Sequence, residues 1–280
     1  MKKKLSLILA LVLAGTMLFT GCGSSDSDSS ASSSADASTG GEAKEEGDTF
    51  TVGFDAEFPP YGYKNDDGEY VGFDLDLAQE VCDRNGWKLV KQPIDWDSKD
   101  AELSSGTIDC IWNGFTITGR EDEYTWTDAY LDNSQIVIVN KDSGIKTLED
   151  LAGKVVIVQA DSSALAAFEG DQADLAATFA ELQQIPDYNS AFMSLKSGAA
   201  DAVALDYGVA QGYLNSDSDY IMLDEEVSSE QYAVGFKKGN TALRDQVQAT
   251  LEEMNEDGTL EKIAENYADY NIPEMLCFGK

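Results

Sequence analysis

The sequence predicts an α/β protein built on mostly parallel sheets. From Thr49 onward, strand-like apolar runs alternate with segments in which apolar residues recur at helical spacing, which is the pattern of this class. The chain has 280 residues, of which 42% are apolar, so it can bury one large core or two smaller ones. Ligands of parallel α/β sheets bind at the carboxyl ends of strands, so we expect the functional residues in the loops that follow the strands.

The first expected elements are a strand over Thr49–Phe54 and a helix over Asp74–Arg84. Apolar residues fall on one side of this helix, and Gly86 follows it as a typical stop signal. The further expected strands are Trp87–Gln92, Ile108–Trp112, Gln135–Val139, Val155–Gln159, Ala202–Leu205 and Gln231–Phe236. The further expected helices are Ser163–Phe168, Ser190–Ser197, Tyr207–Asn215, Thr241–Asp257 and Leu260–Tyr267. The extended runs Gln135–Asn140 and Gln231–Phe236 flank an inserted block, a spacing that suggests paired crossovers between two lobes.

The N-terminus has the pattern of an export signal. A lysine-rich start is followed by an almost uninterrupted apolar run from Leu5 to Phe19, which is short for a membrane-spanning helix. The run ends close to Gly21 and Cys22, and this junction resembles the lipobox of bacterial lipoproteins, in which the cysteine is lipidated and becomes the new N-terminus. We therefore expect a signal peptide over 1–21 and lipidation of Cys22, with an uncleaved anchor as the alternative. Both place the folded part outside the cytoplasmic membrane of a bacterium.

Residues 22–48 are predicted to form a tether behind the lipidated cysteine. This segment is rich in serine and acidic residues and has no large apolar side chain, so it cannot bury enough surface to fold. A flexible tether of this length would let a lipid-anchored domain search the space just above a membrane.

The charge balance and the absence of histidine exclude several functions. The chain has 52 acidic and 19 basic residues and a net charge of −33. A field of this sign repels phosphate backbones, so we expect no nucleic-acid partner. Histidine is the commonest general base and transition-metal ligand, and the chain has none. There is also no GxSxG or CxxC motif, so we expect no metal, no cofactor and no catalytic residue.

The cysteines other than Cys22 are odd in number, which is unusual for an exported protein. Cys110 lies in an apolar, strand-like run and is expected to be a core thiol. A disulfide between Cys82 and Cys277 is compatible with export, but the sequence leaves this pairing open.

Four segments at expected strand or helix ends carry residues suited to ligand binding. They are Asp55–Tyr61, Gly72–Ala78, Asn113–Arg120 and Ala204–Tyr207. An arginine offers a planar fork for a carboxylate, and an aspartate at a strand end can pair with an ammonium group or cap the next helix. Asp74 and Asp76 stand near a helix start and are interpreted as caps rather than ligands.

These segments resemble motifs of the family 3 bacterial extracellular solute-binding proteins, which serve ABC transporters for polar amino acids. The resemblance extends over 49–272 and rests on Phe58–Tyr61, Gly72–Leu77, Thr116–Arg120, Thr147–Lys154 and Ala200–Asp206. It implies a periplasmic-binding-protein fold of type 2, in which two lobes, each a mostly parallel sheet flanked by helices, are joined by two hinge crossovers. We expect lobe 1 to comprise 49–138 plus 233–280, and lobe 2 to comprise 139–232.

The resemblance also implies which residues hold the backbone groups of an amino acid. Arg120 matches the arginine that binds the α-carboxylate, assisted by Thr116 and by Ser162 from the second lobe. Asp206 matches the acid that pairs with the α-ammonium, and Gly114 contributes its carbonyl oxygen. A zwitterion needs such a fork donor, an acid and backbone polar groups when it loses its water.

The ligand side chain would occupy the rest of the same pocket. Phe58 and Trp96 match aromatic residues that sandwich it, Asp55 matches an acid that meets a polar or cationic tip, and Asn113 lines the pocket. These residues suit lysine, arginine or ornithine, and they equally suit an amide such as glutamine. An acidic ligand is not expected, because no second basic residue stands in these loops.

The chain departs from the family pattern at two positions. Only Gly119 separates Thr118 from Arg120, where the family usually has one more residue, and this shortens the loop that carries the arginine. Asp161 stands where many relatives have glycine beside the carboxylate site. An acid there would lower the affinity unless its side chain points away.

The expected function is therefore extracytoplasmic capture of a polar or cationic amino acid by lobe closure, followed by delivery to the permease subunits of an ABC importer. We expect a monomer. The alternatives are a dehydratase-like enzyme on the same fold, with Glu57 as its acid, and an extracellular amino-acid sensor domain. No nucleophile or base accompanies Glu57, and no second membrane segment follows the domain, so neither alternative is preferred.

Overall fold

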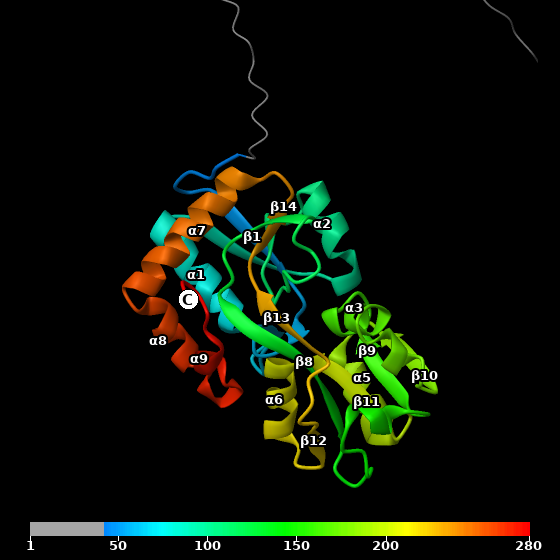
Figure 1. Cartoon of the computed structure of the whole chain (residues 1–280). Helices are drawn as coiled ribbons and strands as arrows, with labels where there is room; N and C mark the ends of the chain where they lie inside the picture. The colour runs from blue at the N-terminus through cyan, green and yellow to red at the C-terminus, as the bar shows by residue number, and fades with distance from the viewer. Residues whose placement is uncertain (1–41) are drawn as a thin grey trace, which may run out of the picture. The chain divides into compact units, whose positions relative to one another are not determined.

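The computed structural model describes residues 42–280 (Figure 1). The expected signal peptide and the lipidation site Cys22 lie outside these residues. Strands are β1 Thr49–Phe54, β2 Glu57–Phe58, β3 Gly62–Lys64, β4 Tyr70–Val71, β5 Lys88–Pro93, β6 Cys110–Ile111, β7 Tyr124–Trp126, β8 Leu131–Asn140, β9 Val155–Gln159, β10 Glu181–Ile185, β11 Ala202–Asp206, β12 Tyr220–Met222, β13 Ser228–Tyr232 and β14 Gly235–Lys237. Helices are α1 Phe73–Asn85, α2 Lys99–Ser105, α3 Ser163–Glu169, α4 Ala173–Ala176, α5 Tyr188–Ser197, α6 Tyr207–Ser216, α7 Thr241–Glu256, α8 Thr259–Glu265 and α9 Ile272–Met275, with short 3₁₀ turns η1 Trp96–Ser98, η2 Leu148–Leu151 and η3 Ala268–Tyr270.

The first large sheet has the strand order β5-β1-β6-β14-β7. β1 runs parallel to both β5 and β6, whereas β14 is antiparallel to β6 and β7. Helix α1 lies against β5 and α7, and α2 lies against β1. The carboxyl ends of β1, β5 and β6 therefore meet at one edge of this sheet.

The second large sheet has the order β10-β9-β11-β8-β12, and β13 also pairs with β8. β9 is parallel to β10 and β11, so their carboxyl ends again share one edge. β8 is antiparallel to its partners: its first half pairs with β13 and its second half with β11 and β12. The α/β class predicted from the alternation is confirmed, and both sheets also contain antiparallel strands.

β8 and β13 form the two crossovers between the sheets, and Figure 1 shows them side by side. The lobe limit expected after residue 138 falls inside β8, which pairs with strands of the second sheet from Leu131 onward. The expected run Gln231–Phe236 is divided by Ala233 and Val234 into β13, in the second sheet, and β14, in the first. In each crossover, the chain therefore passes from one sheet to the other within a few residues.

Residues Lys44–Asp48, which the sequence places in the tether, are packed onto the folded part. The backbone of Lys44 exchanges two hydrogen bonds of 2.8 Å with the side chain of Gln246 on α7. The Lys44 ammonium pairs with Asp109 at 3.0 Å, and the Gly47 amide donates to the carbonyl of Gly86 at the end of α1. This part of the expected tether is ordered because it supplies partners to groups at the end of α1 and on α7.

The three cysteines of the described residues are buried and free. Cys110 is a core thiol, as predicted, and burial raises the pKa of its thiol well above the ordinary value. Cys82 and Cys277 are not bonded to each other, so the disulfide that the sequence allowed between them is not formed.

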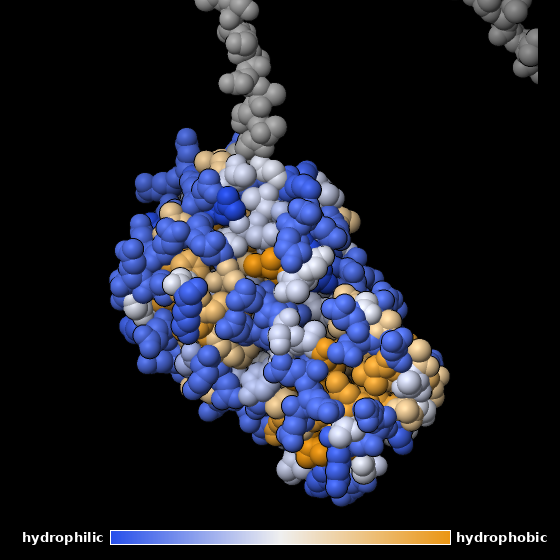
Figure 2. Space-filling view, in the orientation of Figure 1, coloured by the Kyte–Doolittle hydropathy of each residue, from blue (hydrophilic) through white to orange (hydrophobic). Residues whose placement is uncertain are grey.

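The surface is mainly polar on the face drawn in Figure 2, with apolar residues gathered over the second sheet near α3. Within residues 42–280, no helix combines the length and the apolar character that a membrane crossing would need.

Candidate ligand-binding site

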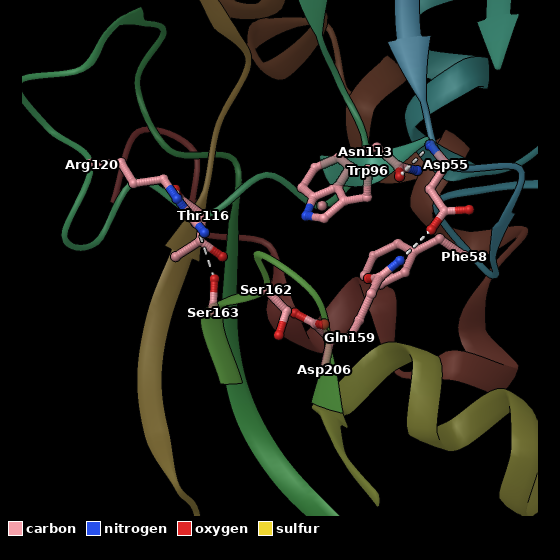
Figure 3. Close-up of a pocket in the computed structure, with 11 residues that line it drawn as sticks. Asp55, Phe58, Trp96, Asn113, Thr116, Arg120, Gln159, Ser162, Ser163 and Asp206 are labelled. Atoms are coloured by element: carbon pink, nitrogen blue, oxygen red, sulfur yellow. Dashed lines mark hydrogen bonds between the residues drawn. The ribbon is translucent and has the colours of Figure 1, made fainter. Parts of the chain in front are cut away.

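A small cavity lies where the carboxyl ends of the two sets of parallel strands face each other. It brings together every residue that the sequence predicted for ligand contact. The lining residues are Asp55, Phe58, Trp96, Asn113, Gly114, Thr116, Arg120, Gln159, Ser162, Ser163 and Asp206. Figure 3 shows Arg120 and Asp55 at opposite ends of this cavity, with the ring of Trp96 between them.

The first sheet supplies most of the lining through the loops after its parallel strands. Asp55 directly follows β1, Trp96 opens η1 after β5, and Asn113 and Gly114 follow β6. Gly114 has φ +56, and a Cβ atom there would lie 3.0 Å from the ring of Phe58. Only glycine fits this position without strain, because the backbone approaches an aromatic side chain of the site in a left-handed conformation.

Arg120 reaches from the first lobe to the second. Its Nη1 donates to Ser163 Oγ at 3.1 Å, and its Nη2 donates to the carbonyl oxygen of Asp161 at 3.3 Å. The short loop noted in the sequence closes with a turn in which Gly119 has φ +82, and this turn directs the arginine into the cavity wall. Ser162 is the N-cap of α3 and accepts a hydrogen bond from the Leu165 amide.

Asp206 ends β11 and is surrounded by donors from both crossover strands. Its Oδ1 accepts hydrogen bonds from Asn133 at 3.0 Å, from Gln135 at 2.7 Å and from the hydroxyl of Tyr232. The same two amides also donate to Glu230, which is buried beside it. Burial and the neighbouring charge of Glu230 raise the pKa of Asp206 to about 7. Asp206 is the N-cap residue of α6, as the sequence allowed, but its side chain makes no capping hydrogen bond.

Asp55 is buried at the other end of the cavity. Its Oδ2 accepts a hydrogen bond from Gln159 Nε2 at 2.7 Å, which crosses between the lobes, and its Oδ1 accepts from the Glu57 amide at 2.8 Å. Its own amide donates to Asn113 at 2.9 Å. Burial raises the pKa of Asp55, and the nearby carboxylates Asp187 and Asp95 raise it further.

Asp74 lies in the first turn of α1 and outside the lining of the cavity, as predicted for a structural residue, but it does not cap the helix. It makes no capping bond in α1; its Oδ2 instead accepts the Gly114 amide at 2.5 Å. Asp76 likewise accepts a hydrogen bond from the hydroxyl of Tyr267 rather than capping the helix. Burial raises the pKa of Asp74 to about 7. Asp74 therefore fixes the backbone of the loop that carries Gly114.

Sequence reasoning missed Gln159 and Ser163 in the cavity, and it missed the polar residues that surround Asp206. Gln159 ends β9, so the strand-end rule that found Asp206 would also have found it. Asn133 and Gln135 alternate on β8 as buried polar residues beside an otherwise apolar run, which is a signal of a polar network. Among the described residues, no group of three or more acidic or cysteine side chains is arranged to hold a metal ion.

Comparisons with known proteins identify the family of this chain. Residues 50–270 match the model of the bacterial extracellular solute-binding proteins, family 3. The arginine-binding extracellular protein ArtP of Bacillus subtilis is 30% identical over 95% of this chain and 98% of its own length. The glutamine-binding protein GlnH of the same organism is 31% identical over 94% and 96%.

Solved structures agree with this similarity. The substrate-binding protein of an ABC uptake transporter from Streptococcus pneumoniae, with bound histidine, has a TM-score of 0.76 and 36% identity, covering 78% of this chain and 92% of that one. Together with the matched family model and the shared two-sheet architecture, this similarity shows what kind of protein the chain is. It belongs to family 3 of the bacterial extracellular solute-binding proteins.

Proposed function

We propose that this protein captures a free L-amino acid with a cationic side chain and delivers it to the permease subunits of an ABC importer. The observation that carries the proposal is the buried carboxylate of Asp55, at the end of the cavity opposite Arg120. Two ends of opposite charge suit a ligand that carries a carboxylate at one end and a cation at the other. The similarity to ArtP, an arginine-binding protein, supports this choice.

The backbone groups of the amino acid would bind where the family resemblance places them. Arg120 would hold the α-carboxylate, with the help of Thr116 and Ser162. Asp206 would pair with the α-ammonium, and Gly114 would accept from it through its carbonyl. Each charge-assisted hydrogen bond contributes about 1.5–3 kcal/mol, so two or three of them support a micromolar or lower dissociation constant.

The side chain would lie between Phe58 and Trp96 and extend to Asp55. Beyond Asp55, an open groove is lined by further acids, among them Glu57, Asp95 and Asp187, and by no arginine or lysine. Burial and the adjacent Asp187 raise the pKa of Glu57, so these acids repel one another. A ligand cation would relieve this repulsion, and an aromatic ring beside it would add a cation–π contact.

We propose binding without catalysis. The alternative dehydratase would use Glu57 as its acid, yet Glu57 is exposed and lines the outer groove rather than the cavity. An extracellular amino-acid sensor domain would use the same pocket and would differ only in the partner protein that recognises the closed form. The similarity of most of the chain to binding proteins of ABC transporters favours the importer.

From the sequence we also propose a signal peptide over 1–21, a lipid anchor on Cys22 and a tether over 22–48 whose last residues, Lys44–Asp48, pack onto the first lobe, so that the monomeric protein works outside the membrane that holds its importer. The proposed lobes are 49–138 with 233–280, and 139–232, with the limit after 138 falling inside the crossover strand β8.

Isothermal titration calorimetry of the full chain tests the ligand class. L-Arginine and L-lysine should bind, and L-citrulline, which has the shape of arginine without its charge, should bind at least about tenfold more weakly, since it loses the charge-assisted bond. Asp55→Asn should reduce this preference, whereas Asp66→Asn, at an exposed turn, should retain it. Equal affinity for L-citrulline or L-glutamine would exclude the cationic class, and no binding of any free amino acid would exclude the function.

A further inference from the structure

Lys99 is a buried lysine that the proposed function does not use. It is the first residue of α2 and is 1% exposed. Its ammonium pairs with the carboxylate of Asp161, which belongs to the other lobe, and lies 5.2 Å from the ring centroid of Trp96. The N-terminus of a helix is unfavourable for a cation, so this buried charge depends on Asp161 and on the aromatic ring.

Asp161 occupies a conformation that favours glycine. Its φ is +57, and it stands between β9 and α3, where its carbonyl oxygen accepts the hydrogen bond from Arg120 Nη2. A residue with a side chain persists in a left-handed conformation when its surroundings compensate for the strain. Here the side chain pairs with Lys99. The sequence raised the concern that an acid at this position would repel the ligand carboxylate, and the structure directs that acid to a lysine instead.

The pair contacts residues at the Arg120 end and in the middle of the ligand cavity. Lys99 lies against Trp96, which lines the middle of the cavity, and the backbone of Asp161 holds the guanidinium of Arg120. Because Lys99 belongs to the first lobe and Asp161 to the second, the ion pair forms only when the lobes are close together. It therefore couples lobe closure to the orientation of two residues of the site.

We propose that Lys99 and Asp161 are positioning residues for amino-acid binding: their ion pair across the cleft holds Trp96 and Arg120 in place and slows the opening of the lobes. This inference rests on the proposed roles of Trp96 and Arg120. Without Lys99, the half-exposed Asp161 side chain loses its partner from the first lobe, and the Asp161 backbone that holds Arg120 is less firmly fixed. Without the Asp161 carboxylate, Lys99 is an unpaired cation beside the ring that packs on the ligand.

The first test measures L-arginine binding to Lys99→Met, Asp161→Asn and the double variant by calorimetry and stopped-flow fluorescence. Each single change should weaken binding about tenfold, mainly through faster dissociation, as expected when one partner of a charge pair is removed. The double variant should be no weaker than the weaker single one, because the pair is already lost. Losses that multiply in the double variant would overturn the coupling. Lys141→Met and Asp219→Asn, which break an exposed ion pair of the second lobe, should change the affinity less than twofold.

Asp161→Gly separates positioning from ordinary structural support. Glycine adopts a positive φ freely, so Asp161→Gly should lose less melting temperature than Asp161→Asn, while both variants, which lack the carboxylate, should weaken L-arginine binding to the same extent. A parallel loss of melting temperature and affinity would assign Asp161 a structural role only.

Hydrogen exchange of the ligand-free protein tests the pair independently of any ligand. Peptides covering 96–105 and 159–165 should exchange faster in Lys99→Met and in Asp161→Asn than in the wild type, and they should be unchanged in Asp219→Asn. If the wild type fails to bind L-arginine, the proposed function is wrong. The exchange result still shows whether the ion pair holds the two segments in place. Unchanged exchange in both variants overturns the inference.

Discussion

The carboxylate of Asp206 shows how a single residue can serve the ligand at the expense of the ligand-free fold. It is buried beside a second acid, Glu230, and no lysine or arginine within residues 42–280 donates to it. Amides of Asn133 and Gln135 partly stabilise the charge, but its pKa is still raised to about 7. The α-ammonium of a ligand would supply the missing cation, so the site is arranged for a bound charge rather than for maximal stability.

The first prediction concerns Asp206→Asn and pH. The pKa of Asp206 in the folded protein lies above its ordinary value of 3.8, so the native state holds a proton more tightly than the unfolded state. The contribution of Asp206 to ligand-free stability is therefore lost as the pH rises from about 4 to about 7. Asparagine carries no charge, so Asp206→Asn should raise the melting temperature at pH 8, and this gain should shrink toward zero near pH 4.

Thermal melts followed by circular dichroism at both pH values check this expectation. Asp224→Asn removes an exposed carboxylate and should give similar small shifts at both pH values. A gain of the same size at pH 4 and pH 8 would show that the charge of Asp206 does not cause it. Asp206→Asn should also lose L-arginine binding at pH 8.

Among the secondary-structure elements, helix α1 determines the position of the loop that carries Gly114. It begins after Gly72, whose φ is +144, and a Cβ atom there would lie 2.2 Å from the carbonyl oxygen of Tyr61. The Phe73 and Asp74 amides bond back to the Pro60 and Tyr61 carbonyls, which fixes the start of the helix. This entry carries Asp74 to the amide of Gly114 and thereby links a helix start to the ligand site.

The second prediction compares Gly72→Ala with Gly258→Ala. Both glycines have positive φ, but a Cβ atom at Gly258 meets nothing within 4 Å. Gly258→Ala should lower the free energy of unfolding by about 1–2 kcal/mol, the cost of the left-handed conformation. Gly72→Ala adds a backbone clash and should lower it by about 2–4 kcal/mol. Chemical denaturation measures both; equal losses would mean that the backbone at Tyr61 yields to the methyl group.

At the scale of the whole described molecule, the N-terminal segment Lys44–Asp48 links elements that are distant from one another in the sequence. It joins the end of α1, the side chain of Gln246 on α7, and Asp109 before β6. These elements are far apart in the sequence, so the segment acts as a clamp on the first lobe.

The third prediction compares two N-terminal deletions. Removal of 1–41 should leave the melting temperature and the L-arginine affinity of the full chain unchanged. Removal of 1–48 also deletes the hydrogen bonds to Gln246 and Gly86, and it should lower the free energy of unfolding by about 1–3 kcal/mol. Denaturant titrations of both deletions measure the difference, and equal stability would show that the clamp contributes nothing.

Much of the fold was predictable because local patterns and tertiary packing agree. The expected strands at 49–54 and 155–159 coincide with β1 and β9, and α1 occupies the expected apolar stripe before Gly86. β10 was missed because its sequence, ELQQI, is mostly polar, and α2 because it is short and has few apolar residues. Strand β8 begins at Leu131, earlier than expected. Its first half is mostly polar and pairs with β13, so the sequence there lacks the apolar run that predicted the second half.

The sequence by itself determined the α/β class, the family resemblance and most of the residues that line the cavity, because strand ends and motif spacing are local properties of the chain. Only the tertiary structure decided what those residues contact. The pairs Lys99–Asp161, Gln159–Asp55 and Arg120–Ser163 join positions that are far apart along the chain. Such contacts depend on how two lobes approach each other, and no periodicity or spacing in a single sequence encodes that distance.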